Sequence, residues 1–236
     1  MSRVPYTTIC LAICLAPLAL AQTDTFTITD SNPNGFTMGG VYVSPYLGTV
    51  QSGNQTIFSG MVICDDFMDE VTVPESWTAS ASTVDSGGTG LFGSTSSTAY
   101  NEVAWLADTL LNNGNYNNRV AASELSFAIW EIFDPGASAY VTSVGSLTQS
   151  QVQSAVSGDI TAAGKKGNYT GPTVTVWTPT SWKGDPSRPQ EFLTIQTPEA
   201  PTLANLGVDL GALLAVIFVL RRRIMRGRLG PSAEKA

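Results

Sequence analysis

Short runs of alternating polar and apolar residues dominate the chain from residue 24 to residue 79, which is typical of β-strands. In residues 24–30, for example, threonines alternate with Phe26 and Ile28. A turn signal, Asn32-Pro33-Asn34-Gly35, follows this run, and Pro45 in the next run indicates a sheet edge or a bulge. The pattern predicts four strands, over residues 24–30, 41–50, 56–64 and 71–79.

In the middle of the chain the apolar positions change to a spacing of about 3.6 residues, which indicates amphipathic helices. This spacing predicts helices over residues 98–112 and 119–133. Thr148 and Gln151 have the spacing of a capping box, which predicts the start of a third helix. Strand patterns then return at residues 173–177 and 191–196.

The order of strands, helices and strands predicts an α+β domain. We expect an antiparallel β-sheet or sandwich with an inserted block of about three helices, within residues 22–197. These residues, about 176 in number, are enough for one ordinary domain with its own core.

The N-terminal segment has the three parts of a secretory signal peptide. Arg3 supplies the positive charge, residues 9–20 are apolar, and Ala19-Leu20-Ala21 ends the segment with small residues. We predict a signal peptide over residues 1–21, with cleavage before Gln22.

Near the C-terminus, residues 202–220 are mostly apolar and would form a helix about 28 Å long, close to the thickness of a bilayer core. Arg221, Arg222 and Arg223 follow at once and would stay on the cytoplasmic side. The pattern predicts a C-terminal transmembrane helix, with the domain outside the membrane and residues 229–236 as a short tail.

Residues 198–228 resemble the PEP-CTERM sorting signal of exopolysaccharide-producing bacteria, which joins a Pro-Glu-Pro motif, a membrane helix and an arginine cluster. Ala200 stands in place of the second proline, and Pro201 comes one position late. The resemblance implies processing by a membrane exosortase and release to the cell envelope or extracellular matrix. Beside the arginine cluster, the matching residues are Pro198, Glu199, Thr202, Leu203, Leu206 and Gly207.

Charge and composition exclude several function classes. The predicted domain holds five basic and sixteen acidic residues, a net charge of −11, which argues against nucleic acid and other polyanions as partners. The chain has no histidine, so catalysis and metal binding that depend on histidine are excluded. Removal of the signal peptide takes Cys10 and Cys14, leaving Cys64 without an intramolecular disulfide partner. We expect no cofactor.

Two stretches, VICDDF (62–67) and ELSFAIW (124–130), resemble the thioester domains of bacterial surface adhesins. Those domains pair a strand cysteine with a glutamine in a TQ-x-A-I-W helix motif and trap nucleophiles through an internal thioester. Cys64 matches the cysteine, and residues 128–130 match the end of the motif, but Ser126 stands where the glutamine should be. A serine hydroxyl cannot form that acyl bond, so this alignment makes Cys64, Ser126 and Trp130 a thioester-like remnant.

Two other interpretations of Cys64 stay open. A cysteine on an apolar strand is commonly a buried, inert core thiol. Alternatively the thiol is reactive, either as a free surface thiol or in a thioester with another glutamine of the chain, such as Gln149 or Gln151.

Carboxylates offer two weaker hypotheses. Asp65, Asp66, Asp69 and Glu70 form an oxygen-rich cluster that suggests calcium, but they lack the spacing of a calcium loop, and we predict no metal site. Pairs of carboxylates for glycoside hydrolysis can be assembled from Asp65, Asp66, Glu102, Glu124 or Glu131.

The sequence favours an exported, non-enzymatic protein of the cell envelope or matrix with a structural, adhesive or glycan-binding role. Its partners would be the membrane, an exosortase and an exopolysaccharide. The alternatives are a covalent thioester-type adhesin that uses Cys64 and a carboxylate-dependent glycan hydrolase. Aromatic candidates for polysaccharide contact are Tyr42, Tyr46, Trp177 and Trp182.

Overall fold

The computed structural model describes residues 24–32, 35–85, 87–88, 90–93, 97–181 and 188–196. The predicted signal peptide, sorting signal, transmembrane helix and tail lie outside these residues. Among the residues that are described, no helix is long and apolar enough to cross a membrane.

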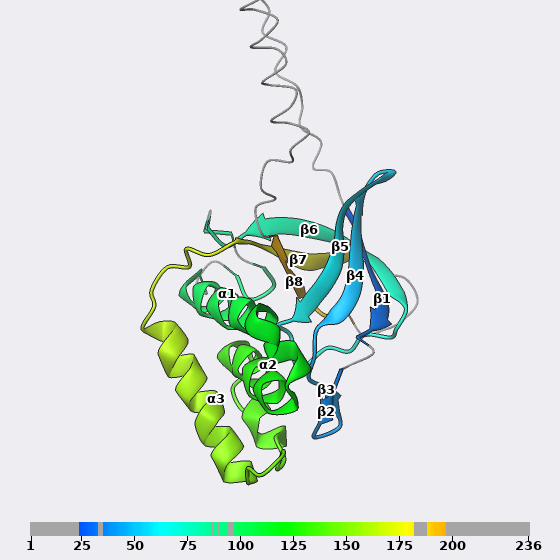
Figure 1. Cartoon of the computed structure of the whole chain (residues 1–236). Coiled ribbons are helices and arrows are strands. Elements are labelled where there is room, and N and C mark those ends of the chain that lie inside the picture. The colour runs from blue at the N-terminus through cyan, green and yellow to red at the C-terminus, as the bar shows by residue number, and fades with distance from the viewer. Residues whose placement is uncertain are drawn as a thin grey trace, which may run out of the picture.

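Six antiparallel strands close into a barrel with the order β1-β4-β5-β8-β7-β6 (Figure 1). Because β8 pairs with both β5 and β7, and β1 pairs with both β4 and β6, the barrel leaves no open edge. The barrel strands are β1 (Asp24–Ser31), β4 (Tyr46–Ser52), β5 (Gln55–Cys64), β6 (Glu75–Thr83), β7 (Thr173–Ser181) and β8 (Phe192–Gln196).

The α+β class with antiparallel strands is confirmed, but the expected sheet or sandwich is a closed barrel. The predicted strand over 41–50 is interrupted near Pro45, as expected. Its first part, β3 (Val41–Tyr42), pairs with β2 (Thr37–Met38) in a separate two-stranded sheet. The strand predicted at 71–79 begins later, at Glu75, and continues to Thr83.

The helical insert between β6 and β7 is confirmed. In the described part of the chain it contains α1 (Ser97–Leu111), α2 (Arg119–Phe133) and α3 (Gln149–Gly164), together with the 3₁₀ helices η2 (Asn112–Asn117) and η3 (Ala137–Tyr140). The predicted capping box at Thr148 and Gln151 starts α3, and the Asn118 side chain caps α2.

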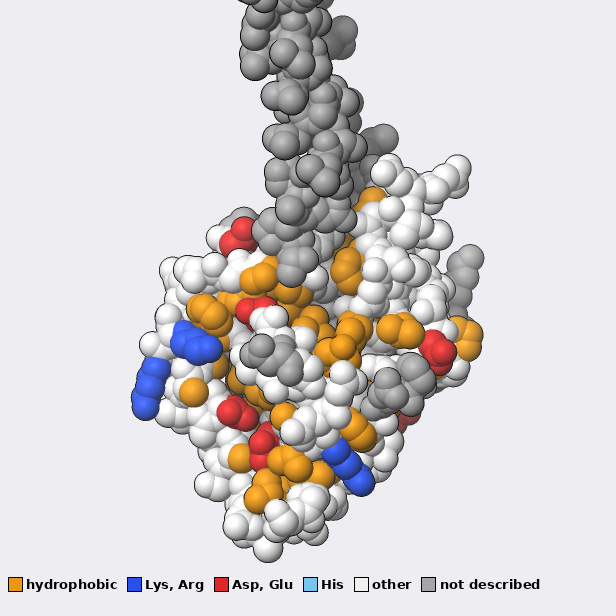
Figure 2. All heavy atoms as spheres, viewed as in Figure 1, with side chains coloured by type: hydrophobic (Ala, Val, Ile, Leu, Met, Phe, Trp, Pro, Cys, Tyr) orange, Lys and Arg blue, Asp and Glu red, His pale blue; other side chains and the backbone are white. Residues whose placement is uncertain are grey.

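Two apolar cores follow from the alternation of side chains along the strands. One fills the barrel, where Phe26, Trp77, Trp177 and Phe192 pack on one another. The other joins the outer face of the barrel to the helices and includes Tyr100 of α1 and Phe127 of α2. Figure 2 shows hydrophobic side chains gathered where the barrel meets the helices, with charged side chains scattered around them.

Candidate functional site

Cys64 is the last residue of β5, where it pairs with Phe192 at the start of β8. Its side chain belongs to the barrel core and is 6% exposed. The thiol donates to the backbone oxygen of Asp66 at 2.9 Å, and the Cys64 carbonyl accepts from Trp130 Nε1 at 3.0 Å. Burial comes first and the neighbouring acidic groups second in raising the pKa of the Cys64 thiol, so the sulfur is held in its neutral form.

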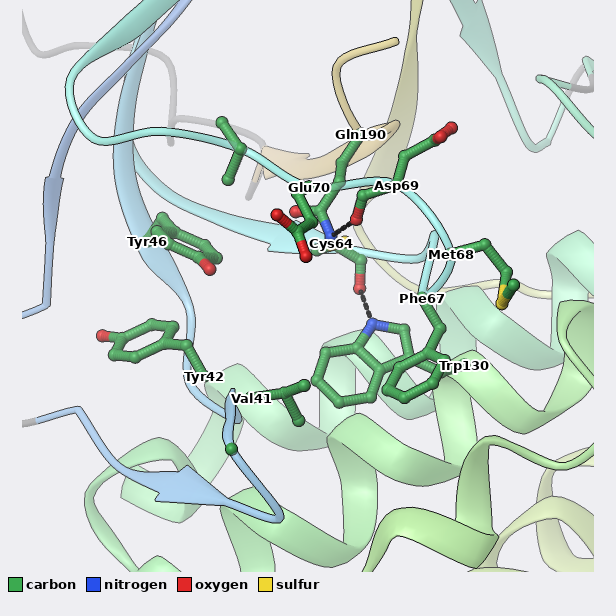
Figure 3. A pocket seen from close by; sticks show the side chains of 12 residues that line it. Val41, Tyr42, Tyr46, Cys64, Phe67, Met68, Asp69, Glu70, Trp130 and Gln190 are labelled. Atoms are coloured by element: carbon green, nitrogen blue, oxygen red, sulfur yellow. Dashed lines mark hydrogen bonds between the residues drawn. The ribbon is translucent and has the colours of Figure 1, made fainter. Parts of the chain in front are cut away.

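Gln190, two residues before β8, lies beside this thiol. Its Nε2 donates to the backbone oxygens of Asp66 at 3.0 Å and Asp69 at 2.6 Å. Because Cys64 Sγ and Gln190 Nε2 are both within 3.0 Å of the same oxygen, they are no more than twice that distance apart. Figure 3 shows the Gln190 side chain directed toward Cys64. Gln190 Oε1 is buried and has no hydrogen-bond partner among the described residues.

The segment that carries these acceptor oxygens, residues 65–70, is held in place by side chains. Asp66 Oδ1 accepts from the backbone nitrogens of Met68 and Asp69, which closes a turn. Arg188 Nε donates to Asp69 Oδ2 at 2.9 Å, and its Nη2 also reaches Asp66 Oδ2 at 3.5 Å. Burial comes first and the neighbouring Asp69 carboxylate second in raising the pKa of Asp66 to about 7.

A cavity of about 350 Å³ opens beside Cys64 and Gln190. Tyr42 and Tyr46, with ring centroids 4.6 Å apart, form one wall, and Phe67 and Trp130, 5.4 Å apart, form the facing wall (Figure 3). The Glu70 carboxylate projects into the space beside Tyr46. The cavity therefore brings a thiol, a carboxamide and an acidic group to one aromatic-walled space.

The structure brings Cys64 and Trp130 together at the cavity, as the sequence suggested, but Ser126 does not join them there. Ser126 is buried one turn earlier in α2 and does not line the cavity. Gln149 and Gln151 lie in the first turn of α3, where Gln151 completes the capping box, and they do not line it either. Gln190 was missed, because the only signal in the sequence was its position just before the predicted strand at 191–196.

The acidic residues after β5 do not converge on one point. Asp65 is fully buried against Glu191, whereas Asp66 and Asp69 meet Arg188. Within the described residues, no group of three or more cysteine, aspartate or glutamate side chains is arranged to hold a metal ion. The carboxylates considered for hydrolysis, Asp65, Asp66, Glu102, Glu124 and Glu131, do not line the cavity.

Some of the aromatic residues predicted to contact polysaccharide line the cavity, and others do not. Tyr42 and Tyr46 line the cavity. Trp177 is 3% exposed inside the barrel, where its Nε1 donates to Thr194 Oγ1 at 2.9 Å, so its predicted contact with polysaccharide is wrong. Trp182 lies outside the described residues, as do the sorting residues Pro198, Glu199, Pro201, Arg221, Arg222 and Arg223.

No protein-family model and no curated protein matches the chain. Among solved structures, the chain is similar to the N-terminal thioester domain of a protein F2 like fibronectin-binding protein from Streptococcus pneumoniae. The TM-score is 0.40 at 10% sequence identity, and the match covers 74% of this chain and 93% of that domain. The similarity is a weak one of overall fold.

Proposed function

We propose that the protein is an exported adhesive module that attaches to its target covalently, through an internal thioester between Cys64 Sγ and Gln190 Cδ. The observation that carries this proposal is the convergence of the Cys64 thiol and the Gln190 amide on the backbone oxygen of Asp66. A thioester needs one thiol and one carboxamide within reach of each other, and Gln190 supplies the carboxamide that Ser126 lacks.

The bond forms by exchange. Cys64 Sγ attacks Gln190 Cδ, the Sγ–Cδ bond forms and the Cδ–Nε2 bond breaks. The thiol proton goes to the departing nitrogen, which leaves as ammonia. Nε2 is already held by the oxygens of Asp66 and Asp69, so the leaving group is oriented before the bond breaks.

In the capture of a target, the Cys64 sulfur becomes the leaving group and an amine becomes the nucleophile. A primary amine attacks Cδ, the Cδ–Sγ bond breaks, and an amine proton returns to sulfur. The target is then joined to the Gln190 side chain by an amide, and the Cys64 thiol is restored. The low exposure of Cys64 limits hydrolysis by water, while the cavity gives an amine a route to the bond.

Each chain would react once, so we propose an adhesive protein and not an enzyme. We further propose that the signal peptide and the sorting signal inferred at residues 1–21 and 198–228 take the domain to the outer face of the membrane or into the matrix. A covalent bond suits that location because it resists mechanical removal.

Intact mass of the purified protein tests the thioester. We expect a mass lighter by one ammonia than calculated, addition of one methylamine on treatment, and alkylation of Cys64 only after that treatment. Cys64→Ala and Gln190→Ala should each restore the full mass and abolish the methylamine adduct. Ser126→Ala and Gln149→Ala are the matched controls and should behave as wild type.

The full calculated mass in the wild-type protein, with no amine adduct under native conditions, would refute the thioester. The Tyr42–Tyr46 wall then supports a second function, non-covalent binding of a carbohydrate, since aromatic rings that line a cavity can pack on the apolar faces of sugars. Retained exopolysaccharide binding by Cys64→Ala, lost in Tyr42→Ala, would identify that function.

A further inference from the structure

A second pair of side chains lies directly behind Cys64 and Gln190. Successive residues of an extended strand point to opposite faces, so Asp65 and Glu191 face the helices while their neighbours face the barrel. The Asp65 backbone nitrogen donates to the Glu191 oxygen at 3.4 Å, which continues the pairing of β5 with β8 by one residue. Both carboxyl groups are fully buried, at 0% exposure.

The Glu191 carboxyl group accepts several hydrogen bonds. Its Oε1 accepts from the Tyr100 hydroxyl at 2.6 Å, and its Oε2 accepts from the Leu91 backbone nitrogen at 2.7 Å. Oε2 also accepts from the Thr178 hydroxyl. Three donors from three different parts of the chain therefore stabilise a negative charge on Glu191.

Asp65 has the opposite surroundings. Neither of its carboxyl oxygens has a hydrogen-bond donor among the described residues, although its carboxyl group lies against that of Glu191. Two carboxylates can hydrogen-bond to each other only when one of them carries a proton. A protonated Asp65 would donate to Glu191, which gives one of its two buried oxygens a partner and removes the repulsion of two buried charges.

The groups that act on Asp65 strengthen this assignment. From β8 it faces Glu191, and from its own loop Asp66, and both are acidic. From α1 it faces the neutral Tyr100, whose hydroxyl donates to Glu191. Burial comes first and these charges second in raising the pKa of Asp65 well above its ordinary value.

We propose that Asp65 and Glu191 share one proton, and that this acid pair positions Cys64 and Gln190 for thioester formation by fastening the end of β5 to the residue before β8. The positioning role rests on the proposed thioester, whereas the shared proton does not. Loss of the proton would place two negative charges side by side in a buried site and would push the two chain segments apart.

The shared proton is tested first, by carbon-13 NMR of protein labelled at the aspartate carboxyl carbons. The signal that disappears in Asp65→Asn belongs to Asp65. We expect its chemical shift to be that of a protonated carboxyl at neutral pH. An ionised Asp65 at that pH would overturn the proposal, whether or not a thioester forms.

The positioning role is tested by the rate of thioester formation. Treatment with ammonia opens the thioester and regenerates Gln190, and re-formation after removal of ammonia is followed by intact mass from pH about 5 to about 10. We expect the wild-type rate to fall on the alkaline side, by about tenfold per pH unit once Asp65 ionises. Asp65→Asn, whose amide donates to Glu191 at every pH, should keep the neutral-pH rate and lose the alkaline fall.

Asp65→Ala should re-form the thioester at least about tenfold more slowly than Asp65→Asn at neutral pH. Asp85→Asn, the same exchange at an exposed site, should show the wild-type profile. If Asp65→Ala re-forms the bond at the wild-type rate, or if Asp65→Asn keeps the alkaline fall, the positioning role is wrong. Absence of any thioester at all pH values would refute the proposed function and leave the NMR result to decide the shared proton.

Discussion

Trp130 connects the helical insert to the candidate site through one side chain. Its Nε1 donates to the Cys64 carbonyl at the end of β5, and its ring packs against Phe67 and Phe127. The side chain is 5% exposed. It therefore contributes both apolar burial and the hydrogen bond that satisfies a buried backbone oxygen.

We predict that Trp130→Ala lowers the free energy of unfolding by about 3–5 kcal/mol, because it leaves a large cavity and an unpaired carbonyl. Urea-induced unfolding measures this loss. Trp105→Ala is the matched control, since Trp105 is only half-buried and its Nε1 donates to Gly167 near the surface, and it should cost less. Equal losses for the two variants would contradict the role assigned to Trp130.

At the scale of residues, the sequence located one half of the candidate site. Cys64 and Trp130 were found because each lies in a recognisable local sequence pattern: Cys64 at the end of a predicted strand, and Trp130 at the end of a helix motif. Gln190 was not found, because its importance depends on the pairing of β5 with β8, and no local pattern encodes that pairing. Ser126 was misleading for the same reason: its place in the motif says nothing about which side chain the fold brings to the thiol.

Among the elements, the loop before α1 contacts the acid pair of Asp65 and Glu191 through the Glu191 carboxyl group. Gly90 lies against the Glu191 carboxylate, and the next backbone nitrogen, that of Leu91, donates to it. A β-carbon built at Gly90 would overlap all three atoms of the carboxyl group. Only glycine lets this loop approach closely enough to cover the buried charge.

We therefore predict that Gly90→Ala destabilises the protein by about 1–3 kcal/mol, because neither the loop nor the buried Glu191 can move away without losing hydrogen bonds. Gly158→Ala is the control: it lies within α3, nothing is near its added β-carbon, and it should stabilise the helix by about 0.5–1 kcal/mol. Thermal melts of the two variants should move in opposite directions. A Gly90→Ala melt at or above that of wild type would rule out the close contact.

Prediction from sequence was most successful for the helices. Their apolar spacing and the capping box at Thr148 are local features; the structure places the first two helices within one residue of the predicted bounds and starts the third at the predicted capping box. The barrel was predicted less well, because its closure depends on β1 pairing with β6 and β8 pairing with β5, which are distant in sequence. The strand alternation that indicates a sheet is the same in a sandwich and in a barrel.

The whole molecule is acidic, and every resolved shift of a carboxyl group has the same direction. Burial raises the pKa of each of these groups, and nearby acidic groups add to the effect at several of them. Few basic side chains are available in the described residues to oppose it. The carboxyl groups are Asp65, Asp66, Glu102, Glu124, Asp134 and Asp159.

This common direction predicts a protein that is more stable in mild acid than in alkali. A carboxyl group with a raised pKa keeps its proton in the folded state at pH values where the unfolded chain has released it. Its contribution is therefore complete below its ordinary pKa and is lost as pH rises through the folded pKa, which is about 7 for Asp66. Each proton released on unfolding changes the free energy of unfolding by about 1.4 kcal/mol per pH unit.

Urea midpoints measured from pH about 4 to about 9 should fall as pH rises, with a slope from Asp66 that levels off above its folded-state pKa of about 7. Asp66→Asn keeps an oxygen for the nitrogens of Met68 and Asp69 but cannot titrate, so it should remove that slope and leave the rest of the curve. A wild-type midpoint that rises between pH about 5 and about 8 would mean that ion pairs such as Arg188 with Asp69 outweigh the buried acids. Because the unfolding curve does not require a thioester, it tests the electrostatics of the fold even in Cys64→Ala.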